Sequence, residues 1–496
     1  FEEEGLPPLD PRLIDFLSIF FKVRNDQGLT ALDKRTFDDF QRYAAETTAD
    51  ISAILIPSDL HDRQMKAVST DLELTDVCTL LELPDLYAAI FADNEDAVYG
   101  EKFFIYTTFS ESQADINPVS PAGFRLIIDD LFHLLSAGDL AMMRMDAIKY
   151  LWKEIGKKNF DMEEGNRLIE VIRILLELAL PEMIPLDEIN SPDAVVYDMA
   201  KDGGFAYLFG QVNSVPAAFN SGTLGPIERF YSMMKQRCPE NLVLFVMLST
   251  HDGRSVQGLG VDRTDGHVTF GQFDDLQQVI SARGGRVKYR SVSKGTIPFD
   301  TFSKVCGEID ITENALDVLF TRNGGSMTLN SKFESEDSLI KSAAEAAGIR
   351  TSEAMKHPAL RFMARWLVEG KAPYELCCTS RDAFDEKKSD GLALSPVEEA
   401  RRLALAQVYV LTFGQTVPAI YFNDLLGLEN DIESLEAGGK PRDLNRHKSS
   451  VQEIEERLRS DEFTREYVPL INRILSTRAG DPAFYPGSSS FEFQAL

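Results

Sequence analysis

Three carboxylates stand at the ends of short apolar runs that are separated by helical patterns. Asp146 follows the run 140–145, Glu188 ends a second short run, and Asp252 follows the run 242–248. In a (β/α)₈ barrel the carboxyl ends of the strands converge on one mouth, where catalytic groups lie. Breaking a glycosidic bond with retention of configuration needs a carboxylate nucleophile and a protonated carboxyl group about 5 Å apart. These residue types in this order indicate a barrel that processes a sugar.

The neighbours of the three carboxylates suggest a role for each. Arg144 lies two residues before Asp146 on the same strand face, so it can hold this carboxylate ionised as the nucleophile. Glu188, at the end of the next strand, is the expected acid/base. Asp252, preceded by His251, is expected to bind sugar hydroxyls as charge develops in the transition state.

Each motif also has a simpler interpretation. An Arg-x-Asp pair is commonly a strand-end ion pair, and His-Asp-Gly is commonly a turn. Glu182 competes with Glu188 for the acid/base role, although it precedes the strand. The ordered occurrence of carboxylates on successive strand ends favours the catalytic interpretation.

The elements that must position these residues alternate along the chain. Apolar spacing predicts helices at residues 120–135, 162–180, 226–238 and 396–413, and one that opens at 37–40. It predicts strands at residues 51–56, 140–145, 205–209, 242–248 and 417–422. Strands that alternate with helices predict an α/β fold, a (β/α)₈ TIM-type barrel with loop insertions.

The expected organisation has four parts. Residues 1–252 form the first part of the barrel, with a reduced inserted region at about 59–105. Residues 253–375 contain Gly-rich turns and form an insertion or lid after the seventh strand, in which 283–290 is interpreted as a solvated hairpin. Residues 376–480 supply the last barrel elements, and 481–496 form a tail.

Composition restricts the partners and the compartment. The chain has 496 residues, is 44% hydrophobic and carries a net charge of −28, which argues against nucleic acid because its backbone requires clustered Lys and Arg. No apolar run reaches the length of a membrane span. The five cysteines show neither a disulfide framework nor a CxxC spacing for zinc. We expect a cytoplasmic protein without nucleic-acid or membrane partners.

The chain also resembles the sucrose phosphorylase branch of the α-amylase superfamily. The resemblance is weak at residues 6–8 and strong from Tyr106 onward. It is carried by residues 106–117, 144–153, 249–253, 417–427, 430–433 and 442–447.

This resemblance implies a retaining double displacement on a small, sucrose-like or glucosylglycerate-like glucoside. It assigns Asp146 as nucleophile, Glu188 as acid/base and Asp252 as transition-state stabiliser. Arg144, His251 and Arg446 would then line the donor-sugar subsite. Neither a metal nor an organic cofactor is implied, and inorganic phosphate is a potential co-substrate.

The chain departs from the family pattern in its N-terminal third. Ser52 stands where the family has a strand-end Asp, and Phe20 replaces an Asp that contacts glucose. The Arg-Pro-Arg stretch associated with phosphate recognition has no counterpart between Asp59 and Tyr106. At the ends, either the first strand and the C-terminal β-domain are absent or the chain belongs to a longer polypeptide. An open barrel edge would need a partner segment or subunit to cover it.

Two functions remain open from the sequence. The first is a retaining α-glycoside phosphorylase or glucosyl transferase, favoured because all three carboxylates are present together. The second is a catalytically degenerate barrel that binds sugar or serves assembly, favoured by Ser52, Ile56-Pro57 and Phe20.

Overall fold

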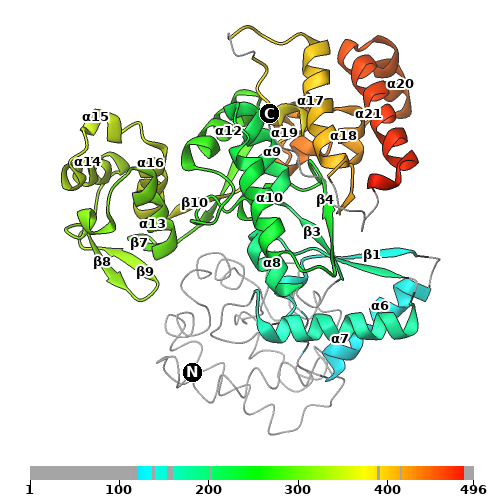
Figure 1. Ribbon diagram of the computed structural model, residues 1–496, viewed down its shortest axis with the longest axis horizontal. Coiled ribbons are helices and arrows are strands. Elements are labelled where there is room, and N and C mark those ends of the chain that lie inside the picture. The colour runs from blue at the N-terminus through cyan, green and yellow to red at the C-terminus, as the bar shows by residue number, and fades with distance from the viewer. Residues whose placement is uncertain are drawn as a thin grey trace, which may run out of the picture. The chain divides into compact units, whose positions relative to one another are not determined.

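The computed structural model describes residues 121–136, 140–152, 160–181, 183–200, 204–387, 391–413 and 416–484, together with Ile116 and Pro118. The chain divides into two compact units, Phe1–Pro185 and Leu186–Leu496, and each is described by itself (Figure 1). The elements predicted at 37–40 and 51–56, the inserted region at 59–105, residues Phe20 and Ser52, and nearly all of the motif at 106–117 lie outside the described residues.

In the first unit, two helices flank a short strand. They are α6 (Pro121–Ser136), β1 (Met142–Met145) and α7 (Glu163–Ala179), with the 3₁₀ turn η1 (Ile148–Tyr150) between β1 and α7. Apolar residues four apart on α7, Leu168, Ile172 and Leu176, form a buried cluster with Met183. The predictions of helices at 120–135 and 162–180 and of a strand at 140–145 are confirmed.

A five-stranded sheet has the order β1-β2-β3-β4-β11. Its further strands are β2 (Ile184–Asp187), β3 (Gly204–Leu208), β4 (Leu242–Val246) and β11 (Thr416–Pro418). The pairs β2–β3, β3–β4 and β4–β11 are parallel. A parallel sheet covered on both faces needs nearly continuous apolar strands, which is why the run at 242–248 was recognisable in the sequence.

Helices connect the parallel strands of the second unit (Figure 1). After β2 comes α8 (Asp193–Met199), and after β3 come α9 (Gly210–Ser221) and α10 (Gly225–Arg237). Pro226 lies in the first turn of α10, where its missing N–H costs nothing. The predicted strand at 205–209 and helix at 226–238 are confirmed.

The chain between β4 and α17 forms two small antiparallel sheets packed with helices. One sheet has the order β5-β10-β6 and the other β7-β9-β8. The elements are β5 (Arg254–Ser255), α11 (Val256–Leu259), α12 (Phe270–Ala282), β6 (Arg286–Ser291), β7 (Thr296–Pro298), α13 (Phe299–Glu308), η2 (Glu313–Leu316), β8 (Phe320–Asn323), β9 (Ser326–Leu329), α14 (Glu336–Ala347), α15 (Thr351–Ala354), α16 (Pro358–Ala364), the π-helical turn η3 (Arg365–Glu369) and β10 (Lys371–Cys377).

The prediction of a solvated hairpin at 283–290 was wrong. Residues Arg286–Ser291 form β6, which pairs with β10 rather than with a strand next to it in the sequence. Of the charged residues that suggested a solvated loop, Arg286 is exposed, but Lys288 and Arg290 are half-buried in this strand. Pairing between strands so distant in sequence leaves no local pattern, so the spacing of residues could not reveal it.

The C-terminal part is mostly helical. It contains η4 (Arg381–Ala383), α17 (Pro396–Leu411), α18 (Phe422–Leu426), α19 (Ile432–Glu436), η5 (Pro441–Asn445), α20 (Val451–Ser460), α21 (Glu462–Gly480) and η6 (Pro482–Phe484). Helix α17 begins at a capping box between Ser395 and Glu398 and lies beside α21 (Figure 1). The helix predicted at 396–413 is confirmed, whereas the strand predicted at 417–422 ends at Pro418 and Phe422 begins α18.

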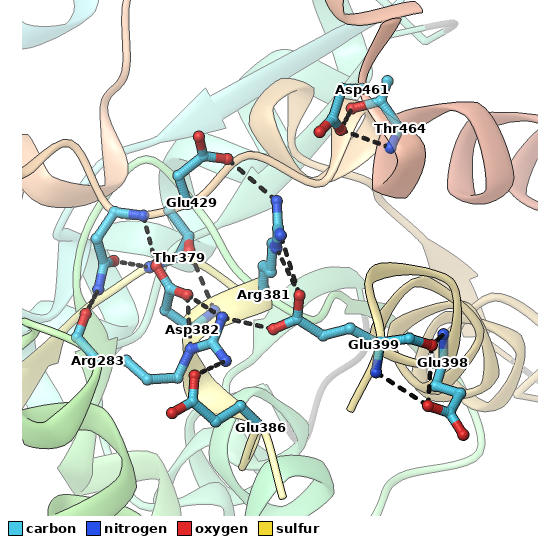
Figure 2. A network of polar contacts seen from close by, with 12 residues as sticks. Arg283, Thr379, Arg381, Asp382, Glu386, Glu398, Glu399, Glu429, Asp461 and Thr464 are labelled. Carbon is cyan, nitrogen blue, oxygen red and sulfur yellow. Dashed lines mark hydrogen bonds and ion pairs between the residues drawn. The ribbon is translucent and has the colours of Figure 1, made fainter. Parts of the chain in front are cut away.

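A buried charge network holds the segment after β10 (Figure 2). Arg283, at the end of α12, contacts Asp382 of η4 at 2.5 Å and Glu399 of α17 at 2.6 Å. Arg381 also contacts Glu399, at 3.0 Å, and Glu429 at 3.2 Å. The network therefore joins α12 to η4 and α17, although Arg283 and Asp382 are 99 residues apart in sequence. Among the described helices, none is long and apolar enough to cross a membrane.

Candidate active site

Loop 249–253, which follows β4, is supported by buried polar contacts on one side. The Ser249 hydroxyl donates to Asp424 Oδ2 at 2.7 Å, and the Ser380 hydroxyl donates to the same oxygen at 2.8 Å. Arg254, 1% exposed, donates to the carbonyl of Leu248 at 3.0 Å. Burial raises the pKa of Asp424, although these hydrogen bonds partly oppose the shift. These contacts fix the two ends of the loop that carries Asp252.

One oxygen of Asp252 accepts hydrogen bonds from two arginines. Arg446 Nη2 lies 2.7 Å and Arg442 Nη1 lies 2.9 Å from Asp252 Oδ1. His251 Nε2 is 3.8 Å from the same oxygen, and Arg446 Nε donates to the His251 carbonyl at 2.7 Å. The structure thus brings together three predicted site residues, His251, Asp252 and Arg446.

The short 3₁₀ helix η5 positions both arginines. Asn445, at its end, donates to the carbonyls of Thr250 at 3.1 Å and Asp252 at 2.9 Å, so η5 is tied to the backbone of the loop. Asn445 as a residue is 1% exposed, in keeping with a structural role for its side-chain amide. Arg442 lies within η5 and Arg446 directly follows it, and both side chains reach the same carboxylate.

Glu375 is a site residue that the sequence analysis missed. It lies in β10, its side chain is 4% exposed, and it accepts from Lys288 Nζ at 2.7 Å and Arg442 Nε at 2.6 Å. Burial raises the pKa of Glu375, but the hydrogen bonds from Lys288 and Arg442 outweigh it, and the pKa is lowered overall. The available signal was a glutamate within the otherwise apolar run 372–378, because a buried charge requires a partner.

Glu188 follows the last residue of β2. Its residue exposure is 7%, and the neighbouring Asp187 is fully buried at 0%. Both belong to the second unit, as do Asp252 and Arg446. The predicted acid/base is thus a buried carboxyl group at the carboxyl end of a parallel strand.

Arg144 and Asp146 lie in the first unit. Asp146 follows β1, and Arg144 Nη2 is 2.9 Å from Asp146 Oδ1. The Asp146 side chain is 72% exposed, against 31% for Arg144. Ala147, with φ of 51°, then turns the chain into η1. The Arg144–Asp146 ion pair expected from the sequence is present, and the catalytic role of Asp146 remains a prediction.

The chain is similar in sequence to several known phosphorylases. No protein-family model matches the sequence. The chain is 24% identical over 395 residues to a glucosylglycerate phosphorylase of Allomeiothermus silvanus. This match covers 78% of this chain and 55% of that protein. It is 22% identical over 484 residues to a glucosylglycerate phosphorylase of Spirochaeta thermophila, which covers 93% of this chain and 68% of that protein. The chain therefore spans about half the length of the first of these relatives.

One solved structure supports the fold. The crystal structure of sucrose 6F-phosphate phosphorylase from Thermoanaerobacter thermosaccharolyticum matches with a TM-score of 0.51 and 18% identity, over 79% of this chain and 59% of that one. Together with the parallel sheet, this match confirms the predicted barrel-type α/β fold. The predicted similarity to the sucrose phosphorylase branch is likewise found over most of the chain.

Proposed function

We propose that the chain carries the catalytic barrel of a glucoside phosphorylase that acts on a small glucoside by a retaining mechanism. The observation that carries the proposal is the arrangement of Asp252 with His251 and Arg446 at the carboxyl end of β4. The names of the relatives support the reaction class, and glucosylglycerate-like or sucrose-like compounds are the proposed substrates.

In the proposed mechanism, Asp146 attacks the anomeric carbon while Glu188 protonates the departing oxygen. The glucosyl group is then bonded to Asp146. A phosphate oxygen next attacks the anomeric carbon and displaces the Asp146 carboxylate, while Glu188 accepts the phosphate proton. Asp252 would interact most strongly with the sugar when positive charge develops on the ring. Two inversions restore the original configuration, so the product would be α-glucose 1-phosphate.

Local charge supports an anionic co-substrate. Arg442 and Arg446 contact Asp252, and Lys288 contacts Glu375, so three positive charges accompany the two negative charges of Asp252 and Glu375. The chain as a whole carries −28. A small cationic excess in an acidic protein creates a local potential that favours phosphate or a substrate carboxylate.

The test uses α-glucosyl fluoride with and without phosphate. We expect the wild-type protein to release fluoride, phosphate to accelerate the release, and Asp146→Asn to abolish it. Fluoride leaves with little acid assistance, so Glu188→Gln should retain this release but lose activity on glucosylglycerate. Proton NMR of the product should show the α-anomer of glucose 1-phosphate.

A wild-type protein that releases no more fluoride than Asp146→Asn would contradict the proposal. Release that is insensitive to phosphate would instead indicate a hydrolase or another transferase. Sugar binding without any turnover, measured by calorimetry, would favour the alternative of a degenerate sugar-binding barrel.

A further inference from the structure

Glu375 connects three elements to the loop that carries Asp252. Its Oε1 accepts from the Gly253 amide at 2.9 Å and from Arg442 Nε at 2.6 Å, while Oε2 accepts from Lys288 at 2.7 Å. With 4% of its side chain exposed, this carboxylate has little access to water. Its position is therefore determined by these three donors, and their positions depend on it.

Gly253 allows the carboxylate to reach the backbone. A Cβ atom at position 253 would lie 2.5 Å from Glu375 Cγ and would overlap its Oε1. Only a residue without a side chain permits this approach, so the glycine of the His-Asp-Gly sequence has a role beyond forming a turn. The backbone directly after Asp252 is thereby held against β10.

Arg442 transmits the position of Glu375 to Asp252. In its planar guanidinium group, Nε donates to Glu375 Oε1, and Nη1 donates to Asp252 Oδ1 at 2.9 Å. Since the donors of a guanidinium group have fixed relative directions, fixing one hydrogen bond orients the other. Arg446 donates to the same Asp252 oxygen at 2.7 Å.

Both arginines bind Oδ1, which determines what the other oxygen can do. Within the part of the chain that the structure describes, no hydrogen bond reaches Asp252 Oδ2. The Asp252 side chain is 26% exposed, so Oδ2 can accept a hydrogen bond from a ligand. Two donors on one oxygen thus select a rotamer that presents the other oxygen.

We propose that Glu375 is a positioning residue that acts through Arg442 and the Gly253 amide to hold Asp252 Oδ2 toward the sugar. The inference rests on the proposed function, because it assigns Glu375 a part in the same glucosyl transfer. Loss of Glu375 is therefore expected to lower kcat for transfer and to leave the affinity for the sugar nearly unchanged.

Three variants separate the contacts of Glu375. Glu375→Ala removes all of them, Glu375→Gln keeps an Oε1 that can accept from Gly253 and Arg442, and Lys288→Met removes only the donor to Oε2. With α-glucosyl fluoride we expect Glu375→Ala to lower kcat by about 10²-fold with KM within about threefold. Glu375→Gln and Lys288→Met should each lower kcat by less than about fivefold.

A second readout does not depend on activity. The Gly253 amide donates to Glu375, so its hydrogen exchange, followed by mass spectrometry in a peptide that contains it, should accelerate at least about tenfold in Glu375→Ala. Glu369→Ala is the matched control, since Glu369 lies two residues before β10, its side chain is 42% exposed, and it interacts with Glu336, Lys371 and Arg365 rather than with the loop that carries Asp252. It should change neither exchange at Gly253 nor kcat.

The outcomes distinguish the two proposals. An inactive wild-type protein contradicts the proposed function, and in that case accelerated exchange at Gly253 in Glu375→Ala supports the inference while unchanged exchange overturns it. With an active wild-type protein, a Glu375→Ala variant of unchanged kcat overturns the inference. Equal losses in Glu375→Ala and Glu375→Gln, with faster exchange throughout the chain, would also overturn it, because they indicate general destabilisation.

Discussion

The three predicted catalytic carboxylates have different surroundings. The Asp146 side chain is 72% exposed beside Arg144, whereas Glu188 is only 7% exposed. In retaining glycosidases an ionised, charge-paired carboxylate serves as nucleophile and a carboxyl group in a drier environment serves as proton donor. The proposed roles of Asp146 and Glu188 are consistent with this difference. Asp252 accepts hydrogen bonds from two arginines through Oδ1, which leaves Oδ2 suited to bind hydroxyl groups.

A buried lysine outside the site leads to a pH prediction. Lys304 is 9% exposed and donates to the Val268 carbonyl at 2.8 Å, and burial lowers its pKa to about 8. Between pH 8 and 10.5 the unfolded chain binds a proton at this lysine that the folded chain does not, so folding stability rises with pH. From pH 7 to about 9.5 the wild-type protein should gain about 2 kcal/mol relative to Lys304→Met.

Urea unfolding of both proteins at the two pH values measures this gain. The control is Lys371→Met, which removes a lysine whose side chain is 57% exposed. A constant difference between wild type and Lys304→Met would show that Lys304 keeps its charge throughout this pH range.

Among the secondary-structure elements, charged side chains join helices that do not adjoin in sequence. Asp382 of η4 accepts a hydrogen bond from Arg283 (Figure 2). Through Oδ2 it also accepts one from the backbone amide of Asn430 at 2.6 Å. Arg381 lies over the Phe463 ring of α21, with 3.8 Å between its Cζ atom and the ring centroid. Such contacts hold η4 between α12 and the C-terminal helices, and they keep the segment that follows β10 in place.

Two partners of Arg283 should differ in importance. Asp382→Ala removes a partner that is 7% exposed and leaves both a buried guanidinium group and the Asn430 amide poorly paired, so we expect a loss of about 2–4 kcal/mol. Glu386→Ala removes a partner of the same arginine that is 60% exposed and 3.5 Å away, and should cost less than about 1 kcal/mol. Unfolding in guanidinium chloride measures the free energy of unfolding of both variants. Equal losses would show that burial of the partner does not determine its importance.

Helices α9 and α8 approach each other closely at Gly210, which leads to a prediction about stability. A Cβ atom at Gly210 would overlap Asp193 Oδ2, the atom that contacts His267 Nε2 at 2.7 Å, and would lie 2.9 Å from the Phe230 ring. Gly210→Ala should therefore destabilise the protein by about 2–4 kcal/mol. Gly307, in α13, has open space around its Cβ position, and Gly307→Ala should stabilise by about 0.5–1 kcal/mol. Thermal unfolding that shifts in the same direction for both variants would contradict this account.

At the scale of the whole molecule, each compact unit contains one of the two tryptophans. Trp152 packs against the cluster of α6 and α7 in the first unit, and Trp366, 5% exposed, donates to the Thr296 carbonyl in the second. Replacing either tryptophan with phenylalanine leaves a fluorescence signal from one unit alone.

We expect the two signals to have different urea midpoints. Trp366 is 5% exposed in the second unit, whereas Trp152 is half-buried in the first. Since stability increases with the apolar area buried, the Trp366 signal should change at higher urea than the Trp152 signal. Coincident midpoints in the two single-tryptophan variants would show that the chain unfolds as one cooperative unit.

The sequence by itself determined the elements of the barrel and the residues at their ends. Apolar spacing along α7 and the continuous apolar run of β4 are local patterns, so the helix and the strand were predicted close to their observed bounds. The same reasoning placed Asp252 and His251 directly after a parallel strand. The Arg144–Asp146 pair was predictable because its members are two residues apart on one strand.

Only the tertiary structure decided which side chains surround Asp252. Arg442 meets it across 190 positions of sequence and meets Glu375 across 67, and Glu375 meets Lys288 across 87. The strand at 286–291, first interpreted as part of a hairpin, is fixed by pairing with β10. Such contacts form when separate elements pack together. Their energies depend on many residues that are distant in sequence, so no local spacing of residues predicts them.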